Sequence, residues 1–331
     1  MAGERSMSSA TSLQALVERY LLERRRLGFA LRSPAYALRS FARHIQAIGH
    51  RGPLTVELMA DWARCDSHGS SDPRTWARRL KQLHPFTRWL QQFEPRTELA
   101  DDAIFGPMSE RLAPHIYSEQ EIVDLLAAAR RLGPAPGLRG AVFEALFGLI
   151  ACTGLRISEA LALRNTDVDL KHGMLTVLET KFTKSRQVPM HRSAVEALRR
   201  YRSMRDLLSE SAQEEAAFFI CTRGRRRGLP LSERQVHRVF ADLRAQLAWR
   251  NRGAHHAPRI HDMRHSFIVR RIVRWQAQEV DIDQAMLSLS TYVGHAKVTN
   301  TYWYLSAVPE LMSLAAERFE SFMSQPEVPD A

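Results

Sequence analysis

The stretch VGHAKVTNTYWYL, residues 293–305, contains Tyr304, which stands nine residues after His295. Upstream of it lie three further polar patches: TGLRISE at 153–159, a basic segment at 181–186 and HDMRH at 261–265. Together the four patches supply two arginines, two histidines, a lysine and a tyrosine. Fixed guanidinium groups match the negative charge that builds on a phosphodiester under attack, and a phenol can hold the broken strand covalently. These parts suit cleavage of a phosphodiester without metal.

The order and spacing of the patches resemble the tyrosine recombinase, or phage integrase, family, over roughly the C-terminal two thirds of the chain. That family has an arginine in a TGLRxSE turn, a lysine in a β-hairpin, an HxxRH segment and a GH dipeptide nine residues before a tyrosine. In this sequence the pattern falls on Arg156, Lys181, His261, Arg264, His295 and Tyr304. The resemblance implies an α+β fold, mainly helical with a small β-sheet, in which a helical core-binding domain precedes the catalytic domain.

The resemblance also implies a role for each residue. Arg156 and Arg264 would clamp the scissile phosphate, because a planar guanidinium matches a phosphate edge better than an ammonium group does. Lys181 would protonate the departing 5′ oxygen. His261 and His295 would hydrogen-bond the phosphate or help to deprotonate the phenol.

Tyr304 would attack the phosphate and form a 3′-phosphotyrosyl link, which a 5′ hydroxyl of a partner duplex then attacks. The nine-residue spacing selects Tyr304 over Tyr302, which we interpret as a packing or DNA-facing aromatic. Glu159 lies one helical turn after Arg156, so we expect it to orient the active-site cations.

Two lysines share the predicted hairpin, although only five of the 47 basic residues are lysines. An acid must lose its proton near neutral pH, which arginine cannot do. The family pattern favours Lys181 over Lys184 as this acid, and the choice between them stays open. Lys184 and Arg186 would then contact phosphates.

Histidines outside the family pattern are interpreted as structural or solvated. His265, His255 and His256 are therefore left out of the chemistry. His261 and His265 are spaced as a zinc-binding pair, but no HExxH carboxylate and no CxxC pair accompany them. We expect no metal and no other cofactor.

The chain of 331 residues has a formal charge of +11 and a pI near 10.1, which favour a polyanionic partner. Surface charge that only keeps the protein soluble is the alternative. We expect the partner to be double-stranded DNA recombination sites, bound by a homo-tetramer on synapsed DNA and a monomer in solution. Accessory proteins remain an open question.

Three cysteines, an odd number with no closely spaced pair, fit a reducing compartment. The start of the chain is polar, and the longest apolar stretch, 141–152, is too short to span a bilayer. We therefore expect a cytoplasmic, nucleoid-associated protein with no membrane partner.

The N-terminal part carries helical spacing and no strand signal. We expect disorder over 1–11 and a helical, DNA-binding core-binding domain over 12–94, with Ser12 and Thr55 as helix caps. Its helices are predicted from Ser12 onward and at 34–48, 55–65 and 73–92. Residues 95–116 mix proline, glycine and charge, so they are predicted to be the interdomain linker, which would let two domains close around a duplex.

The catalytic domain is predicted over 117–308. Its helices are expected at 118–132, 138–152, from Arg156, and at 193–209, 232–249, 262–277 and 282–292. The alternating segment 174–190 predicts a hairpin with Lys181 at its tip. A final helix at 309–323, within the tail 309–331, would pack on its own domain or dock on a neighbouring subunit; both stay open.

Beyond the active site, basic side chains are expected to track the DNA backbone rather than read bases. The predicted DNA contacts are Lys184, Arg186, Arg223, Arg225, Arg226, Arg227, Arg234, Arg238, Arg78 and Arg79.

The predicted function is a site-specific DNA recombinase that integrates or excises a mobile element. A nicking-closing topoisomerase would use the same residues on one duplex. A catalytically inactive DNA-binding relative could keep the fold. The sequence does not specify the target site.

Overall fold

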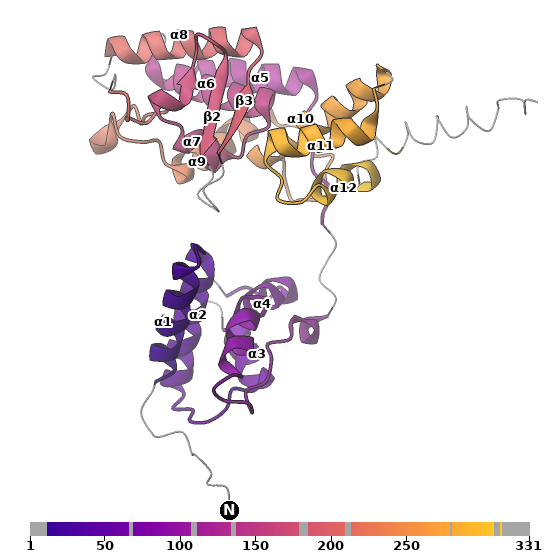
Figure 1. Cartoon of the computed structure of the whole chain (residues 1–331). Helices are drawn as coiled ribbons and strands as arrows, with labels where there is room; N and C mark the ends of the chain where they lie inside the picture. Colours follow the sequence, from indigo (N-terminus) through magenta and orange to yellow (C-terminus); the bar gives the residue numbers. More distant parts are fainter. Residues whose placement is uncertain are drawn as a thin grey trace, which may run out of the picture. The chain divides into compact units, whose positions relative to one another are not determined.

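The computed structural model describes residues 12–65, 69–106, 111–133, 137–178, 185–208, 213–278, 280–307 and 312. The chain divides into two compact units, Met1–Arg111 and Leu112–Ala331 (Figure 1). The predictions for Lys181, Lys184, the first eleven residues and the helix 309–323 lie outside the described residues, apart from Met312.

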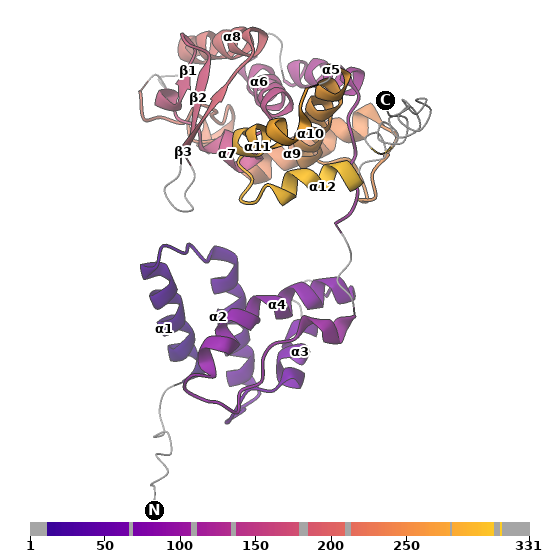
Figure 2. The same cartoon turned by 45° about the vertical axis from the view of Figure 1, so that its right-hand side comes forward.

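The described part of the first unit contains the four predicted helices, which are labelled in Figure 2. They are α1 (Leu13–Arg26), α2 (Arg32–Ala47), α3 (Val56–Arg64) and α4 (Pro73–Leu90). The side chains of Ser12 and Thr55 accept hydrogen bonds from the backbone of the first turns of α1 and α3, as predicted for N-caps. The second helix begins two residues earlier than predicted, so that Pro34 lies inside its first turn.

Aromatic side chains hold the first unit together. Tyr20 of α1 packs against Phe86 and Trp89 of α4 at ring-centroid distances of 5.5 and 5.4 Å. Phe41 of α2 meets Trp62 of α3 edge to face at 5.5 Å. Large rings bury much apolar area for few fixed torsions, so they give a small helical unit a core of its own.

Part of the predicted linker belongs to this first core. Ala100 is fully buried, and its carbonyl contacts Nδ1 of His84 at 2.8 Å. The 3₁₀ helix η1 (Asp102–Phe105) follows, and Phe105 lies 5.7 Å from the ring of Trp76. A composition rich in proline and charge therefore did not identify which linker residues are buried, because burial is set by the neighbouring helices.

The second unit carries eight helices and a small sheet in its described part. The helices are α5 (Glu119–Arg130), α6 (Leu138–Thr153), α7 (Ile157–Ala162), α8 (Arg192–Leu208), α9 (Glu233–Leu247), α10 (Ile260–Ala277), α11 (Ile282–Val293) and α12 (Thr299–Ala307). The short 3₁₀ turns are η2 (Asn165–Asp167) and η3 (Gly224–Arg226). The mainly helical fold with a small sheet is confirmed.

Helix α6 forms the centre of this unit and contacts α5, α8 and α10 (Figure 1). It is apolar around most of its circumference, as expected of a helix packed on several sides. A Cβ added at Gly140 would stand 2.3 Å from the carbonyl oxygen of Arg130, so glycine there permits close packing of α6 on α5. The predicted capping box of Ser118 and Glu121 begins α5.

The sheet is antiparallel in the order β1 (Val168–Asp169), β2 (Met174–Leu178), β3 (Ser185–Pro189). The predicted hairpin is confirmed by the pairing of β2 with β3, in which Val177 lies opposite Arg186. Helix α11 packs against β3, so the sheet brings Arg186 toward the C-terminal helices.

Helices α10, α11 and α12 share a third apolar cluster that includes Ile268, Met286 and the ring of Tyr304. The linker residue His115 is buried at the edge of this unit, and the amide of Tyr117 donates to Ser266 Oγ at 2.8 Å. The residue directly after the predicted linker is therefore anchored on α10. No helix in the described part of the chain is long and apolar enough to cross a membrane.

Candidate active site

The first arginine of the site follows a tight turn at the end of α6. Gly154 ends that helix with φ +66°, a left-handed conformation that favours glycine. A Cβ at this position would stand 2.6 Å from the ring of Phe267. The turn delivers Arg156 to the N-cap of α7, as predicted, with its backbone N–H donating to Glu159 Oε2 at 2.9 Å.

Glu159 joins two arginines from different elements. Arg156 Nη1 donates to Glu159 Oε1 at 2.7 Å, and Arg186 Nη2 of β3 donates to Glu159 Oε2 at 2.9 Å. Burial alone would raise the pKa of Glu159, but the hydrogen bonds and charges of Arg186 and Arg156 outweigh it and hold the pKa below its usual value. The carboxylate is therefore ionised and holds both guanidinium groups; its role in orienting active-site cations stays a prediction.

Arg186 was predicted to contact phosphates. In the structure its guanidinium is instead bonded to Glu159 and to the carbonyl of Tyr292. Its side chain is 10% exposed, and its Nε donates to the carbonyl of Tyr292 at 2.9 Å. Together with the bonds to Glu159, these contacts direct the guanidinium into the protein. Arg186 thus contacts Arg156 only through the Glu159 carboxylate that both guanidinium groups share.

The second arginine, Arg264 of α10, is 1% exposed. Its Nη1 donates to the carbonyl of Gly154 and its Nη2 to the carbonyl of Val293, each at 2.7 Å. Burial and the neighbouring charge of Arg156 lower the pKa of Arg264 to about 10, so the group still carries its charge at neutral pH.

Both arginines donate hydrogen bonds to backbone carbonyls of the turn that ends α11. Arg156 Nη2 donates to the carbonyl of Gly294 at 2.8 Å, next to the carbonyl that Arg264 contacts. Gly294 has φ +69° and caps α11, and the following amide of His295 donates to Ser290 at 2.9 Å. Residues separated by more than 130 positions in sequence are thus brought to one turn.

His295 lies beside Tyr304. Its Nδ1 is 2.7 Å from Thr301 Oγ1, which fixes the orientation of the ring. The imidazole and phenol rings are nearly parallel, 10° apart, with centroids 6.5 Å apart. The structure therefore brings Arg156, Arg264, His295 and Tyr304 into one region.

Tyr304 itself is completely buried, and its hydroxyl lies 2.6 Å from Nδ1 of His265. Sequence reasoning had left His265 out of the chemistry, so this contact was missed. The sequence did contain a usable signal: His265 follows Arg264 directly and stands one helical turn after His261. In the structure the rings of His261 and His265 are in contact, with centroids 4.7 Å apart.

His261 lies in the first turn of the same helix. Packing around the ring, together with the charges of Arg264 and Arg259, lowers the pKa of His261 to about 4, although part of the residue is exposed. The imidazole is therefore neutral at physiological pH. A neutral ring can donate one hydrogen bond and accept another.

The predicted DNA contacts fall into two groups. The side chains of one group are exposed: Arg78, Arg223, Arg225, Arg226, Arg227, Arg234 and Arg238. Arg79 differs, because its Nη2 donates to the carbonyls of Trp62 and Cys65 at 3.0 and 3.1 Å and its guanidinium covers the Trp62 ring at 4.6 Å. Arg79 therefore holds the end of α3, and the exposed group remains predicted to bind DNA.

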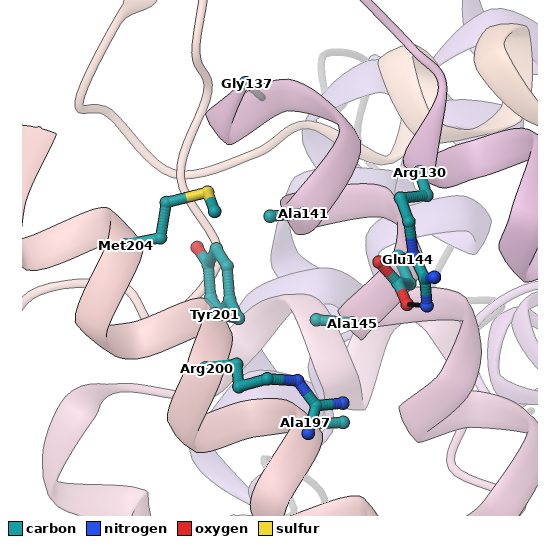
Figure 3. A pocket seen from close by; sticks show the side chains of 9 residues that line it. All are labelled: Arg130, Gly137, Ala141, Glu144, Ala145, Ala197, Arg200, Tyr201 and Met204. Atoms are coloured by element: carbon teal, nitrogen blue, oxygen red, sulfur yellow. Dashed lines mark hydrogen bonds and ion pairs between the residues drawn. The ribbon is translucent and has the colours of Figure 1, made fainter. Parts of the chain in front are cut away.

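The second unit also contains a hollow. It has a volume of about 770 Å³. Arg130, Glu144, Ala145, Tyr201 and Met204 are among the side chains that line it, chiefly from α6 and α8 (Figure 3). None of the predicted catalytic residues contributes to it.

Comparison with known proteins agrees with the geometry. Residues 116–310 match the model of the phage integrase family. The integrase/recombinase y4rB of Sinorhizobium fredii is 36% identical over 94% of this chain and 98% of its own length. The tyrosine recombinase XerC of Chlorobaculum tepidum is 31% identical, over 70% of this chain and 68% of its own length.

Solved structures show the same fold at low identity. The Tn1549 transposon integrase in complex with transposon right end DNA matches with a TM-score of 0.63 and 16% identity, over 93% of this chain and 99% of that one. The XerH site-specific recombinase bound to difH substrate in a post-cleavage complex matches with a TM-score of 0.61 and 18% identity, over 94% and 86%.

Proposed function

Because this chain belongs to the phage integrase family and is a tyrosine recombinase, an enzyme that cleaves and rejoins DNA strands at specific sites, we propose that Tyr304 is its nucleophile. Arg156 and Arg264 bind the scissile phosphate, and His261 and His295 assist at its oxygens or at the phenol. In the cleavage step the phenol oxygen bonds to phosphorus, the bond to the 5′ oxygen breaks, and Lys181 gives that oxygen a proton.

One observation supports this assignment above the others: guanidinium groups from α7 and α10 both reach the turn at 293–294, beside the helix that carries Tyr304. Their hydrogen bonds to fixed carbonyls preorganise them before a substrate binds. Preorganised cations stabilise charge as it develops, with no further reorganisation during the reaction.

We also propose that the enzyme moves a mobile element and acts as a tetramer on two paired duplexes. The integrase/recombinase relative is matched over nearly its whole length, whereas the XerC relative is matched over about two thirds of its length. Joining two duplexes requires four strand cleavages, and one nucleophile per protomer then calls for four protomers.

For DNA binding, the first unit offers a row of exposed basic side chains along one side of α4. These are Arg74, Arg78, Lys81 and Arg88, which are spaced by three, four or seven residues. The second unit offers the arginines around η3 and the start of α9. Exposed guanidinium and ammonium groups neutralise backbone phosphates and release counterions.

The test of the nucleophile is a covalent adduct. Wild-type protein, incubated with DNA of the element ends and then denatured, should carry labelled DNA, and Tyr304→Phe should carry none. Tyr302→Phe is the matched control, since the Tyr302 hydroxyl contacts Asp283 at 2.8 Å and lies outside the site. No adduct with wild type, or an adduct that persists in Tyr304→Phe, would contradict the proposal.

A second assay separates recombination from nicking and closing of a single duplex. Two differently labelled linear DNA molecules should be joined to each other by the recombinase. Relaxation of a supercoiled plasmid without any joined product would indicate a topoisomerase.

A further inference from the structure

His265 is the imidazole that contacts the oxygen of the proposed nucleophile. Its Nδ1 lies 2.6 Å from the Tyr304 hydroxyl, a length typical of a strong hydrogen bond. Both side chains are buried: His265 is 4% exposed and Tyr304 is not exposed at all. In such surroundings a hydrogen bond is stronger than in water, and a misplaced partner is costly.

The helix under His265 is held firmly. The preceding Arg264 is bonded to two backbone carbonyls, and the following Ser266 accepts the amide of Tyr117 and donates to Asp262 at 2.8 Å. The ring of His265 also contacts Trp303, the neighbour of Tyr304, with centroids 6.3 Å apart. The contact between imidazole and phenol therefore joins two positioned elements.

The other two histidines of the site are arranged differently. His295 directs its Nδ1 to Thr301 and lies parallel to the face of the phenol ring, with centroids 6.5 Å apart. His261 contacts the ring of His265 edge to face at 4.7 Å. Geometry thus places Nδ1 of His265 at the phenol oxygen, whereas Nδ1 of His295 faces Thr301.

We infer that His265 accepts the phenol proton when Tyr304 attacks DNA and returns it when the strand is rejoined; this rests on the proposed function. In cleavage the bond between Oη and phosphorus forms, the bond from phosphorus to the 5′ oxygen breaks, and the proton on Oη moves to Nδ1. In rejoining, a 5′ hydroxyl attacks phosphorus and gives its proton to Lys181, the bond to Oη breaks, and Nδ1 returns the phenol proton to Oη. Nε2 keeps its own proton throughout.

The size of the effect follows from general acid–base catalysis. A phenol is a weak acid, so its proton leaves as the new bond to phosphorus forms rather than beforehand. A positioned base typically contributes about 100-fold to 10,000-fold to the rate of such a step. Removal of the acceptor nitrogen should therefore slow both cleavage and rejoining by at least about 100-fold.

The cleavage test uses His265→Asn, whose amide can hydrogen-bond the phenol but cannot take its proton. The substrate carries sulfur in place of the departing 5′ oxygen, so that the leaving group needs no proton and the rate reports activation of Tyr304. In a single turnover His265→Asn should be at least about 100-fold slower than wild type. His172→Asn, an exposed histidine paired with Asp169, is the control and should match wild type.

The rejoining test separates proton transfer from damage to the site. A 3′ end activated with p-nitrophenol loses its leaving group without a proton and does not use Tyr304. In a Tyr304→Phe background, addition of His265→Asn should leave attack by a 5′ hydroxyl on this end unchanged to within about threefold, although rejoining from the phosphotyrosine is slow.

Two results would overturn the inference. One is cleavage of the sulfur substrate by His265→Asn to within about threefold of wild type. The other is parallel loss of the p-nitrophenyl reaction in both His265→Asn and His265→Gln, which would assign His265 to maintenance of the phosphate site. Failure of the wild-type protein to form any adduct would instead refute the proposed function.

Discussion

Removal of the Glu159 carboxylate should destabilise the catalytic unit and slow cleavage together. The side chains of Glu159 and Arg186 are each 10% exposed, and that of Arg156 is 37% exposed. In Glu159→Ala the two guanidinium groups would face each other without the carboxylate between them. An uncompensated charge in a buried site costs far more than the lost contact itself.

The expected loss lies at the lower end of the range for a broken buried ion pair, about 3 kcal/mol, because Arg156 can partly rehydrate. Urea unfolding followed by circular dichroism should show a midpoint lower by about 1 M if the m-value is about 3 kcal/mol/M. Cleavage should fall by about 100-fold, since a clamp displaced by about 1 Å loses that much.

The control is Glu196→Ala in the same unit. Glu196 pairs with Arg192 at 3.0 Å, a distance close to those of Glu159, but the two side chains are 46% and 90% exposed. An exposed pair one helical turn apart is worth about 0.3–0.5 kcal/mol. If Glu159→Ala costs no more than Glu196→Ala, the charge between the arginines does not hold the site together.

Gly154→Ala should lose about 2 kcal/mol in urea unfolding and most of its cleavage activity, because a Cβ would be strained at φ +66° and would strike a neighbouring phenylalanine ring. Gly224→Ala, with φ +63° and nothing within 4 Å, should show the strain alone. Packing around the ring and neighbouring guanidinium groups lower the pKa of His261 to about 4 from 6.5. Between these values the unfolded chain binds a proton that the native protein does not, so the free energy of unfolding should fall as pH drops from 6.5 to about 4. His261→Gln should flatten this decline in the free energy of unfolding. An unchanged slope against pH would contradict the assignment of the decline to His261. Arg78→Ala should weaken DNA binding and lower its salt slope by about one without a change in stability, whereas Arg79→Ala should lower the melting temperature of the first unit.

Local signals in the sequence predicted most of the fold. Ser12, Thr55, Ser118 and Glu121 are cap residues whose hydrogen bonds are made within four positions, so their patterns identify helix starts without knowledge of the tertiary structure. The alternation over 174–190 likewise predicted the hairpin. The order and spacing of the polar patches were enough to assign the two arginines, His295 and Tyr304 to one predicted site.

Contacts set by tertiary packing could not be predicted in this way. Arg186 looked like one more exposed cation of a basic hairpin, but α11 packs on β3 and turns the side chain toward Glu159. His265 looked like a helix residue of no special role, because its partner stands 39 positions later on α12. Ala100 is buried beside His84 and Thr87 of α4, and His115 is buried beside Arg252, which stands 137 positions later.

The net charge of the site fits the reaction that it is proposed to catalyse. Arg156, Arg186 and Arg264 contribute three positive charges and Glu159 one negative charge, which leaves two positive charges among these four side chains. A phosphodiester carries one negative charge in the ground state and gains more as the phenol attacks. The backbone carbonyls that hold the guanidinium groups orient them without neutralising them. The excess positive charge is therefore matched to the transition state rather than to the resting phosphate, and binding energy used in this way lowers the barrier.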